Sequence, residues 1–217
     1  VGIDNRSTMD MDITIKNYPI NVEMISKAIH EICAIAIDDN VYFSFSGIES
    51  IRDGDVYGGY RVTIISEYDG IKTPMQIDIT TGDRITPKEV FYQYKMNFKE
   101  GSIHVWSYNI ETILAEKVET ILRRGELNTR PRDFYDVYIL TKTQFFDHSV
   151  FIEALRTTAS HREATHIFNN IVNRLDEICV SEDLRNRWLK YTNDYRYAVG
   201  ITYEDVIDSI RKLTQSL

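Results

Sequence analysis

The sequence contains little cysteine, proline or glycine, and it has no long apolar run. Its 217 residues include 2 Cys, 4 Pro and 10 Gly. This scarcity excludes a disulfide-stapled scaffold, a collagen-like chain and a low-complexity protein. No apolar stretch approaches the roughly 20 residues of a membrane-spanning helix, and no signal-peptide pattern opens the chain. Because 43% of the residues are hydrophobic, the sequence predicts a globular cytoplasmic protein with no membrane partner and with reduced thiols at Cys33 and Cys179.

Basic residues are outnumbered, since 25 Lys and Arg against 33 Asp and Glu give a formal net charge of -8. An acidic surface repels nucleic acid, so such a partner would need a local basic patch or bound metal ions. The stretch from Lys117 to Arg132 contains five bases and two acids. It is the predicted place for an RNA backbone or a triphosphate, although a solvated loop fits the same composition.

Hydrophobic periodicity divides the chain into two halves. Alternation of polar and apolar residues predicts strands in the first half, around one helix with apolar residues at helical spacing. The expected strands are 9–16, 41–51, 60–68 and 75–80, and the expected helix is 22–37. Amphipathic helices are expected at 110–124, 132–141, 150–158, 164–178, 181–195 and 203–213. The sequence therefore predicts an α/β lobe over residues 1–105 and a helical lobe over residues 106–217.

Acidic residues alternate with apolar ones at two places in the first half. Asp10 and Asp12 are two positions apart on one predicted strand, so their side chains leave the same face of the sheet. Asp78 lies between two isoleucines on another predicted strand. If these strands are neighbours, three carboxylates converge, as Mg²⁺ or Mn²⁺ at a phosphoryl-transfer site requires. The alternative is that these acids lie on the solvent-exposed face of an antiparallel sheet, where polar and apolar residues alternate in the same way.

A lysine interrupts the apolar stripe of the helix predicted at 110–124. Lys117 lies three residues after Leu114 and four before Ile121, and a charge there is costly unless it is paired or faces a cleft. Asp133 or Asp136 of the next helix is a predicted partner, and such a held lysine suits a nucleoside triphosphate. Two other interpretations of Lys117 are open: its side chain extends along the apolar surface to reach water, or its ion pair is purely structural. Asp133 can also be explained as an acid in the first turn of a helix, where it stabilises the helix dipole.

Four short blocks stand out when the chain is read in order: Arg6–Asp12 (RSTMDMD), Ile77–Pro87 (IDITTGDRITP), Tyr108–Lys117 (YNIETILAEK) and Arg132–Asp136 (RDFYD). Together they resemble the AbiEii/AbiGii toxin family of nucleotidyltransferase-like toxins, which belong to bacterial toxin–antitoxin and phage abortive-infection systems. The resemblance extends over most of the first 140 residues and is looser in the helical tail.

The resemblance implies an α/β fold similar to the DNA polymerase β-like nucleotidyltransferases, followed by a helical C-terminal lobe. It implies transfer of a nucleotide from an NTP to an acceptor, such as the 3′ end of tRNA, with Mg²⁺ or Mn²⁺. The result would be growth arrest or phage defence. By matching motif positions, Asp10 and Asp12 would be the paired metal ligands and Asp78 the third acid.

The same correspondence implies roles for the remaining polar residues of the four blocks. Arg6 and Ser7 would bind the nucleotide, Lys117 would face the triphosphate, and Asp133 would be the catalytic acid of the last motif, with Asp136 as its competitor. The partner implied by the family is a cognate antitoxin that acts mainly as a repressor of the operon, without necessarily binding the toxin.

One departure from the family pattern concerns the start of the chain. The family has a Gly-Gly or Gly-Ser turn on a helix shortly before the paired acids, where backbone amides hold the nucleotide phosphates. This chain begins with Val1 instead of Met, and Gly2 is too close to the acids and lacks a partner. We therefore expect a fragment without that segment, which keeps the acids but can be inactive. The alternatives are an inactive NTP- or RNA-binding module of the same fold and a kinase-like phosphotransferase.

Overall fold

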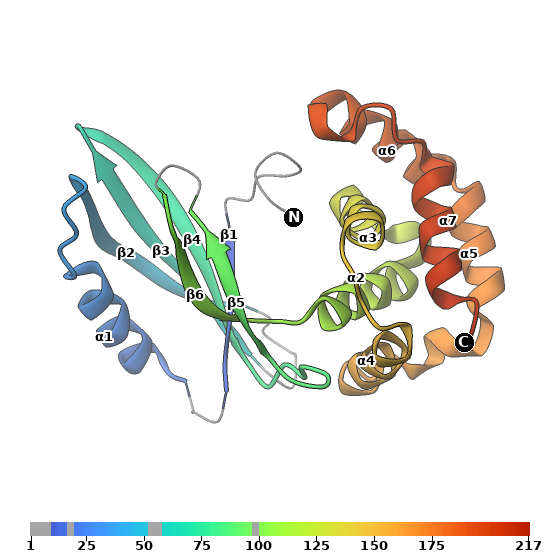
Figure 1. The fold of residues 1–217 in the computed structure, drawn as a ribbon, viewed down its shortest axis with the longest axis horizontal. Helices are drawn as coiled ribbons and strands as arrows, with labels where there is room; N and C mark the ends of the chain where they lie inside the picture. Colours follow the sequence, from blue (N-terminus) through green and yellow to red (C-terminus); the bar gives the residue numbers. More distant parts are fainter. Residues whose placement is uncertain (1–9, 17–19, 52–57, 97–99) are drawn as a thin grey trace. The chain divides into compact units, whose positions relative to one another are not determined.

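The computed structural model describes residues 10–16, 20–51, 58–96 and 100–217 (Figure 1). The chain divides into two compact units, which meet in the sequence at Asp83 and Arg84. The first is called the sheet unit here (Ser7–Asp83), and the second the helical unit (Arg84–Leu217). The boundary predicted between residues 105 and 106 lies further along, within the second strand of a hairpin that forms a small sheet of its own. Within the described residues, no helix is long and apolar enough to cross a membrane.

The sheet unit combines a mixed sheet with one helix. Its strands run in the order β1-β4-β3-β2, with β1 parallel to β4 and the other pairs antiparallel. The elements are β1 (Asp10–Ile15), α1 (Val22–Cys33), β2 (Val41–Ile51), β3 (Gly59–Tyr68) and β4 (Ile71–Thr81). The turn at Asp69 and Gly70 joins β3 to β4, and both residues have positive φ angles. This is the backbone that a two-residue hairpin needs, so the turn sets the β3–β4 register.

The two faces of this sheet differ in chemistry. Ile25 and Ile29 of α1 pack on one face, against a buried cluster formed by Val62, Ile64, Ile77 and Ile79. Side chains at alternate positions of the same strands leave the opposite face. That face carries mainly polar side chains, among them Gln76, Asp78 and Thr80 of β4. The predicted alternation therefore corresponds to a half-buried sheet with one polar face.

Two predicted boundaries in the sheet unit were wrong. Helix α1 ends at Cys33, short of the expected Ile37, because Ile35 and Ile37 are exposed and gain no burial that would pay for further helix. Strand β4 begins at Ile71, before Pro74. Pro74 is tolerated inside β4 because the pairing with β1 begins only at Gln76, so the missing N–H leaves no gap in that described pairing.

The helical unit begins with a hairpin that periodicity did not predict and continues with helices close to those predicted. Its elements are β5 (Val90–Lys95), β6 (Ser102–Ser107), α2 (Ile110–Arg124), α3 (Pro131–Thr143), α4 (His148–His161), α5 (Ile171–Val180), α6 (Glu182–Asp194) and α7 (Tyr203–Thr214), with short 3-10 turns η1 (Gly125–Leu127), η2 (Thr165–Asn170) and η3 (Arg196–Ala198). The helix expected at 164–178 is divided between η2 and α5.

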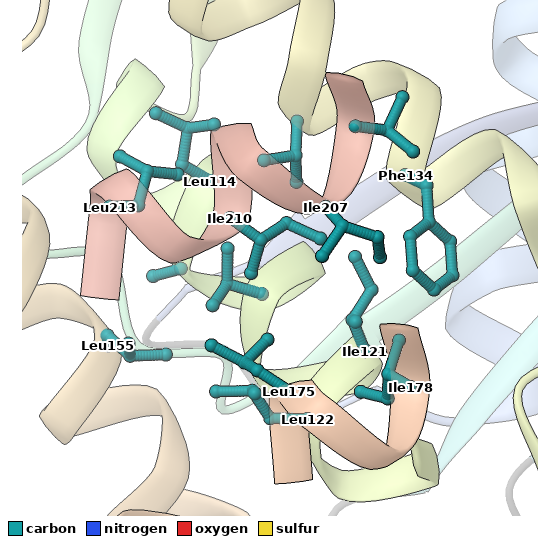
Figure 2. Close-up of a cluster of buried hydrophobic side chains, with 14 of the residues drawn as sticks. Leu114, Ile121, Leu122, Phe134, Leu155, Leu175, Ile178, Ile207, Ile210 and Leu213 are labelled. Atoms are coloured by element: carbon teal, nitrogen blue, oxygen red, sulfur yellow. The ribbon is translucent and has the colours of Figure 1, made fainter. Parts of the chain in front are cut away.

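Helix α2 lies at the centre of the helical core. Figure 2 shows its side chains Ile121 and Leu122 gathered with Ile207 and Ile210 of α7 and with Ile178 of α5. Each of these side chains is almost fully buried, which stabilises the fold by about 1.5–3 kcal/mol per side chain. Because α2 is enclosed on several sides, even its polar residues are held in fixed surroundings.

Asn109 fixes the start of α2. Its side-chain oxygen accepts a hydrogen bond from the Thr112 amide at 2.7 Å, so Asn109 is the N-cap of α2. Its side-chain nitrogen donates to the carbonyls of Thr86 and Lys88, both at 2.8 Å. One buried amide therefore ends the extended segment before β5 and begins the central helix.

We predict that Asn109→Ala lowers the free energy of unfolding of the helical unit by about 2–4 kcal/mol, because the helix loses its cap and the carbonyls of Thr86 and Lys88 each lose a hydrogen bond. Asp147→Ala is the matched control, since Asp147 caps α4 from an exposed position and its loss should cost about 1 kcal/mol. Urea unfolding followed by circular dichroism measures both. Equal losses in the two variants would contradict the role given to Asn109.

Candidate functional site

The predicted acids of the first half lie on the polar face of the sheet. Strands β1 and β4 are neighbours, as the sequence argument required, and Asp12 pairs in register with Asp78. Asp10 precedes Asp12 by two positions and pairs with Gln76. Residues that are in register on adjacent strands, or two apart on one strand, share a face. The backbone therefore brings all three acids to one side of the sheet.

Arg61 is a polar residue of this face that the sequence did not single out. It pairs in register with Asp78, and its Nε and Nη2 each donate to a different Asp78 carboxylate oxygen at 2.8 Å. Such a two-pronged contact fixes the plane of the carboxylate as well as its position. Only the register of β3 with β4 reveals this pair, because Arg61 lies in a strand without any motif.

The chemistry of these acids fits a hard divalent cation. Carboxylate oxygens are the ligands that Mg²⁺ and Mn²⁺ prefer, and Asp12 is exposed beside Asp78. Among the side chains that the structure describes, no three acids, histidines or cysteines lie close enough to hold a metal ion. The side chain of Asp10 lies outside this described set. Asp10, Asp12 and Asp78 would hold the ion, which would neutralise phosphate charge.

Asp83 ends the same polar region at the last residues of β1 and β4. It accepts hydrogen bonds from the hydroxyls of Thr14 at 2.9 Å and Thr80 at 2.6 Å. Thr14 and Thr80 are themselves in register. Asp83 therefore ties the chain leaving β4 to the parallel pair that carries Asp12 and Asp78.

In the helical unit, Lys117 lies between two carboxylates of the next helix. Its Nζ is 2.7 Å from Asp136 Oδ2 and 3.4 Å from Asp133 Oδ1. The side chains of Lys117, Asp133 and Asp136 are 22%, 8% and 1% exposed, respectively. The predicted ion pair across α2 and α3 is therefore present, and it includes both acids that the sequence left as competitors.

The distances rank the two acids. Asp136 makes the shorter contact and is buried, which makes it the main anchor of the lysine. Asp133 is in the first turn of α3, where a carboxylate also stabilises the helix dipole. The helix-dipole interpretation of Asp133 therefore describes part of its role. A buried ion pair is costly to break, because one charge is left without a partner in a dry environment.

A second charged cluster joins α2 to the residue that follows α4. Glu119 is fully buried and accepts from Arg123 Nε at 2.7 Å and from Arg162 Nη1 at 2.6 Å. Glu119 lies outside the apolar stripe of α2, so periodicity alone gives no sign that it is buried. Its two arginines satisfy its charge, so we interpret the cluster as structural.

The other residues that the sequence suggested are the nucleotide-binding pair, the basic stretch and the two cysteines, and the structure describes only some of them. Arg6 and Ser7 lie outside the described residues. Of the basic stretch, Arg123 is engaged by Glu119, whereas Arg130 and Arg132 are exposed and make no ion pair with any described residue. Cys33 and Cys179 are free thiols and partly buried.

We predict that Lys117→Met lowers the free energy of unfolding of the helical unit by about 3–5 kcal/mol, because two buried carboxylates lose their cation. Adding Asp133→Asn and Asp136→Asn to this variant should restore most of the loss. Lys142→Met, at an exposed position of α3, should change stability by no more than about 0.5 kcal/mol. A loss below about 1 kcal/mol for Lys117→Met in urea unfolding would show that the pair is not buried in solution.

Two solved structures are similar to this chain. A candidate nucleotidyltransferase from H. pylori has a crystal structure that is 19% identical in sequence, with a TM-score of 0.46, and the match covers 98% of this chain and 80% of that chain. JHP933 from Helicobacter pylori is 17% identical, with a TM-score of 0.41 and coverage of 88% and 81%. None of the curated proteins compared with the chain matches it.

The profile of one protein family matches residues 1–209, which is nearly the whole chain. That family is described as the nucleotidyl transferase AbiEii toxins of type IV toxin–antitoxin systems. The match includes all four blocks of the sequence on which the resemblance was based. The chain therefore belongs to the AbiEii family of nucleotidyl transferase toxins, whose systems pair each toxin with a cognate antitoxin.

Proposed function

We propose that this toxin transfers a nucleotide from an NTP to an acceptor RNA, the 3′ end of tRNA, with the help of Mg²⁺ or Mn²⁺. The observation that carries the proposal is the register of Asp12 with Asp78 on the polar face of the sheet, with Asp10 on the same side. Family membership supports the reaction type. Carboxylates in this arrangement suit a cation that also binds substrate phosphates.

The three acids and Arg61 of the sheet unit each have a role in this proposal. A bound Mg²⁺ would neutralise charge on the phosphates and lower the pKa of the attacking hydroxyl. Asp10, Asp12 and Asp78 would hold that ion, and Arg61 keeps the Asp78 carboxylate in one orientation through its two hydrogen bonds. Arg61 is therefore a positioning residue, because it contacts a ligand of the ion and not the substrate.

Lys117 binds the triphosphate of the NTP. A lysine ammonium has three N–H donors, and Asp133 and Asp136 accept from two directions, which leaves one donor for a phosphate oxygen. Asp136 limits the movement of the ammonium, so the cation is positioned before the substrate arrives. In the reaction, a hydroxyl oxygen of the acceptor bonds to the α-phosphorus and loses its proton to water. The bond to the β-phosphate breaks, and pyrophosphate leaves.

The cellular setting follows from this chemistry. NTPs and tRNA are cytoplasmic, so we assign the reaction to the cytoplasm. Modified tRNA ends would stop translation, which gives growth arrest and protection of a population against phage. We assign to the cognate antitoxin the role of operon repressor, so that toxin activity is controlled through its synthesis.

The proposal predicts that the protein, incubated with bulk tRNA, Mg²⁺ and each α-³²P-labelled NTP in turn, labels tRNA with at least one NTP. Asp12→Asn should reduce labelling at least 100-fold, because a metal ligand is lost, and EDTA should abolish it. Glu67→Gln, which removes a carboxylate from an exposed ion pair on β3, should leave labelling unchanged. Label transferred from γ-³²P-labelled NTP would instead identify a kinase-like phosphotransferase, and NTP binding without transfer would identify an inactive binding module.

Growth arrest gives a second test in cells. Expression of Lys117→Ala should no longer arrest bacterial growth, because the triphosphate loses its cation, whereas Lys142→Ala on the neighbouring helix should remain toxic. Both variants must reach equal soluble levels, measured by immunoblot. Full toxicity of Lys117→Ala would remove Lys117 from the proposed mechanism.

A further inference from the structure

The hairpin of β5 and β6 displays an unusual number of exposed rings. Phe91, Tyr92, Tyr94 and Trp106 are all exposed, although aromatic side chains normally contribute to a core. Neither strand contains a carboxylate, in a chain with a net charge of -8. The nearest acids in the sequence, Glu89 and Glu100, lie outside the two strands.

The strand register sorts these side chains onto two faces. Phe91 pairs with Trp106, Gln93 with His104, and Lys95 with Ser102, and these six residues form what we call the ring face. The opposite face, called the tyrosine face, contains Val90, Tyr92, Tyr94, Ile103 and Val105. Only the ring face combines aromatic rings with an amide, an imidazole and an ammonium group.

The rings of the ring face lie next to one another. The Phe91 and His104 rings are nearly parallel, with centroids 5.2 Å apart and an interplanar angle of 15°. The Phe91 and Trp106 centroids are 5.0 Å apart, and their planes are tilted by 51°, so the two rings present surfaces in different directions. Gln93 is held beside them by a hydrogen bond from its Nε2 to Ser102 Oγ at 2.8 Å. Phe91 is 59% exposed and Trp106 is 70% exposed, so flat surfaces remain available for stacking.

We propose that the ring face binds single-stranded RNA by stacking unpaired bases on Phe91 and Trp106. Unpaired bases stack on exposed aromatic side chains whatever their sequence, and a carboxylate-free surface with a lysine does not repel the phosphates. Lys95 contacts the phosphate backbone of the RNA, and Gln93 and His104 offer hydrogen bonds to the edges of the bases. The inference rests on the proposed function, since it makes this hairpin the place that holds the unpaired end of the acceptor RNA.

Binding is measured without NTP or Mg²⁺, so that it is independent of catalysis. A fluorescein-labelled single-stranded oligoadenylate is titrated with the protein, and anisotropy gives the affinity. Phe91→Ala should weaken binding by about tenfold or more, because a stacking surface is lost. Tyr92→Ala is the matched control, because Tyr92 is the next residue, is 54% exposed and lies on the tyrosine face.

Tryptophan fluorescence locates the bound RNA. The chain has two tryptophans, and Trp188 is 4% exposed with its indole N–H bonded to the Ile201 carbonyl, so quenching by RNA reports on Trp106. The single-stranded RNA should quench this emission, and Trp106→Phe should retain the affinity but lose the quenching. Circular dichroism of each variant checks that the fold is unchanged.

Three results would overturn the inference: an equal loss of affinity in Phe91→Ala and Tyr92→Ala, equal binding of a duplex of the same length, or RNA binding without quenching. Quenching that depends on protein concentration in the absence of RNA would instead identify the ring face as a contact between two copies of the chain. If no RNA binds but label from α-³²P-labelled NTP still reaches some acceptor, the inference fails while the proposed nucleotide transfer stands.

Discussion

The parallel pairing of β1 with β4 determines what the sheet can do chemically. It joins two segments that are more than 60 residues apart in the sequence, and its register places Asp12 beside Asp78. A slip of one residue would move the acids of β1 to the face covered by α1 and expose its apolar side chains. The packing of Ile25 and Ile29 on the sheet therefore also fixes the side on which the carboxylates appear.

The helical unit places its charges by a different means. Lys117 and Glu119 are two residues apart on α2, and each is held by opposite charges from another part of the unit. The pair formed by Lys117 keeps 22% of the lysine exposed, whereas Glu119 is fully enclosed. This difference in access separates an ion pair that can take part in binding from one that only maintains the packing.

The helices and most strands could be predicted from periodicity, and so could the contact of Lys117 with α3, because a lysine in an apolar stripe requires a partner. The bidentate contact of Arg61 with Asp78 could not be predicted, since it depends on a register that a single sequence does not contain. Glu119 was missed because α2 is buried on several sides, which no single stripe indicates. The β5–β6 hairpin was missed because its rings and β-branched residues are exposed instead of alternating with a core.

The turn at Asp69 and Gly70 restricts how this protein can diverge. Residues 61 and 78 face each other because they are equally far from a two-residue turn. A single residue inserted into one of the two strands between them would shift Arg61 out of register with Asp78, whereas one added residue on each strand would leave them opposed. Insertions and deletions within these two strands should therefore survive selection only in matched pairs. Homologues that keep the arginine and the two-residue turn should differ from this chain by an even number of residues between the arginine and the aspartate.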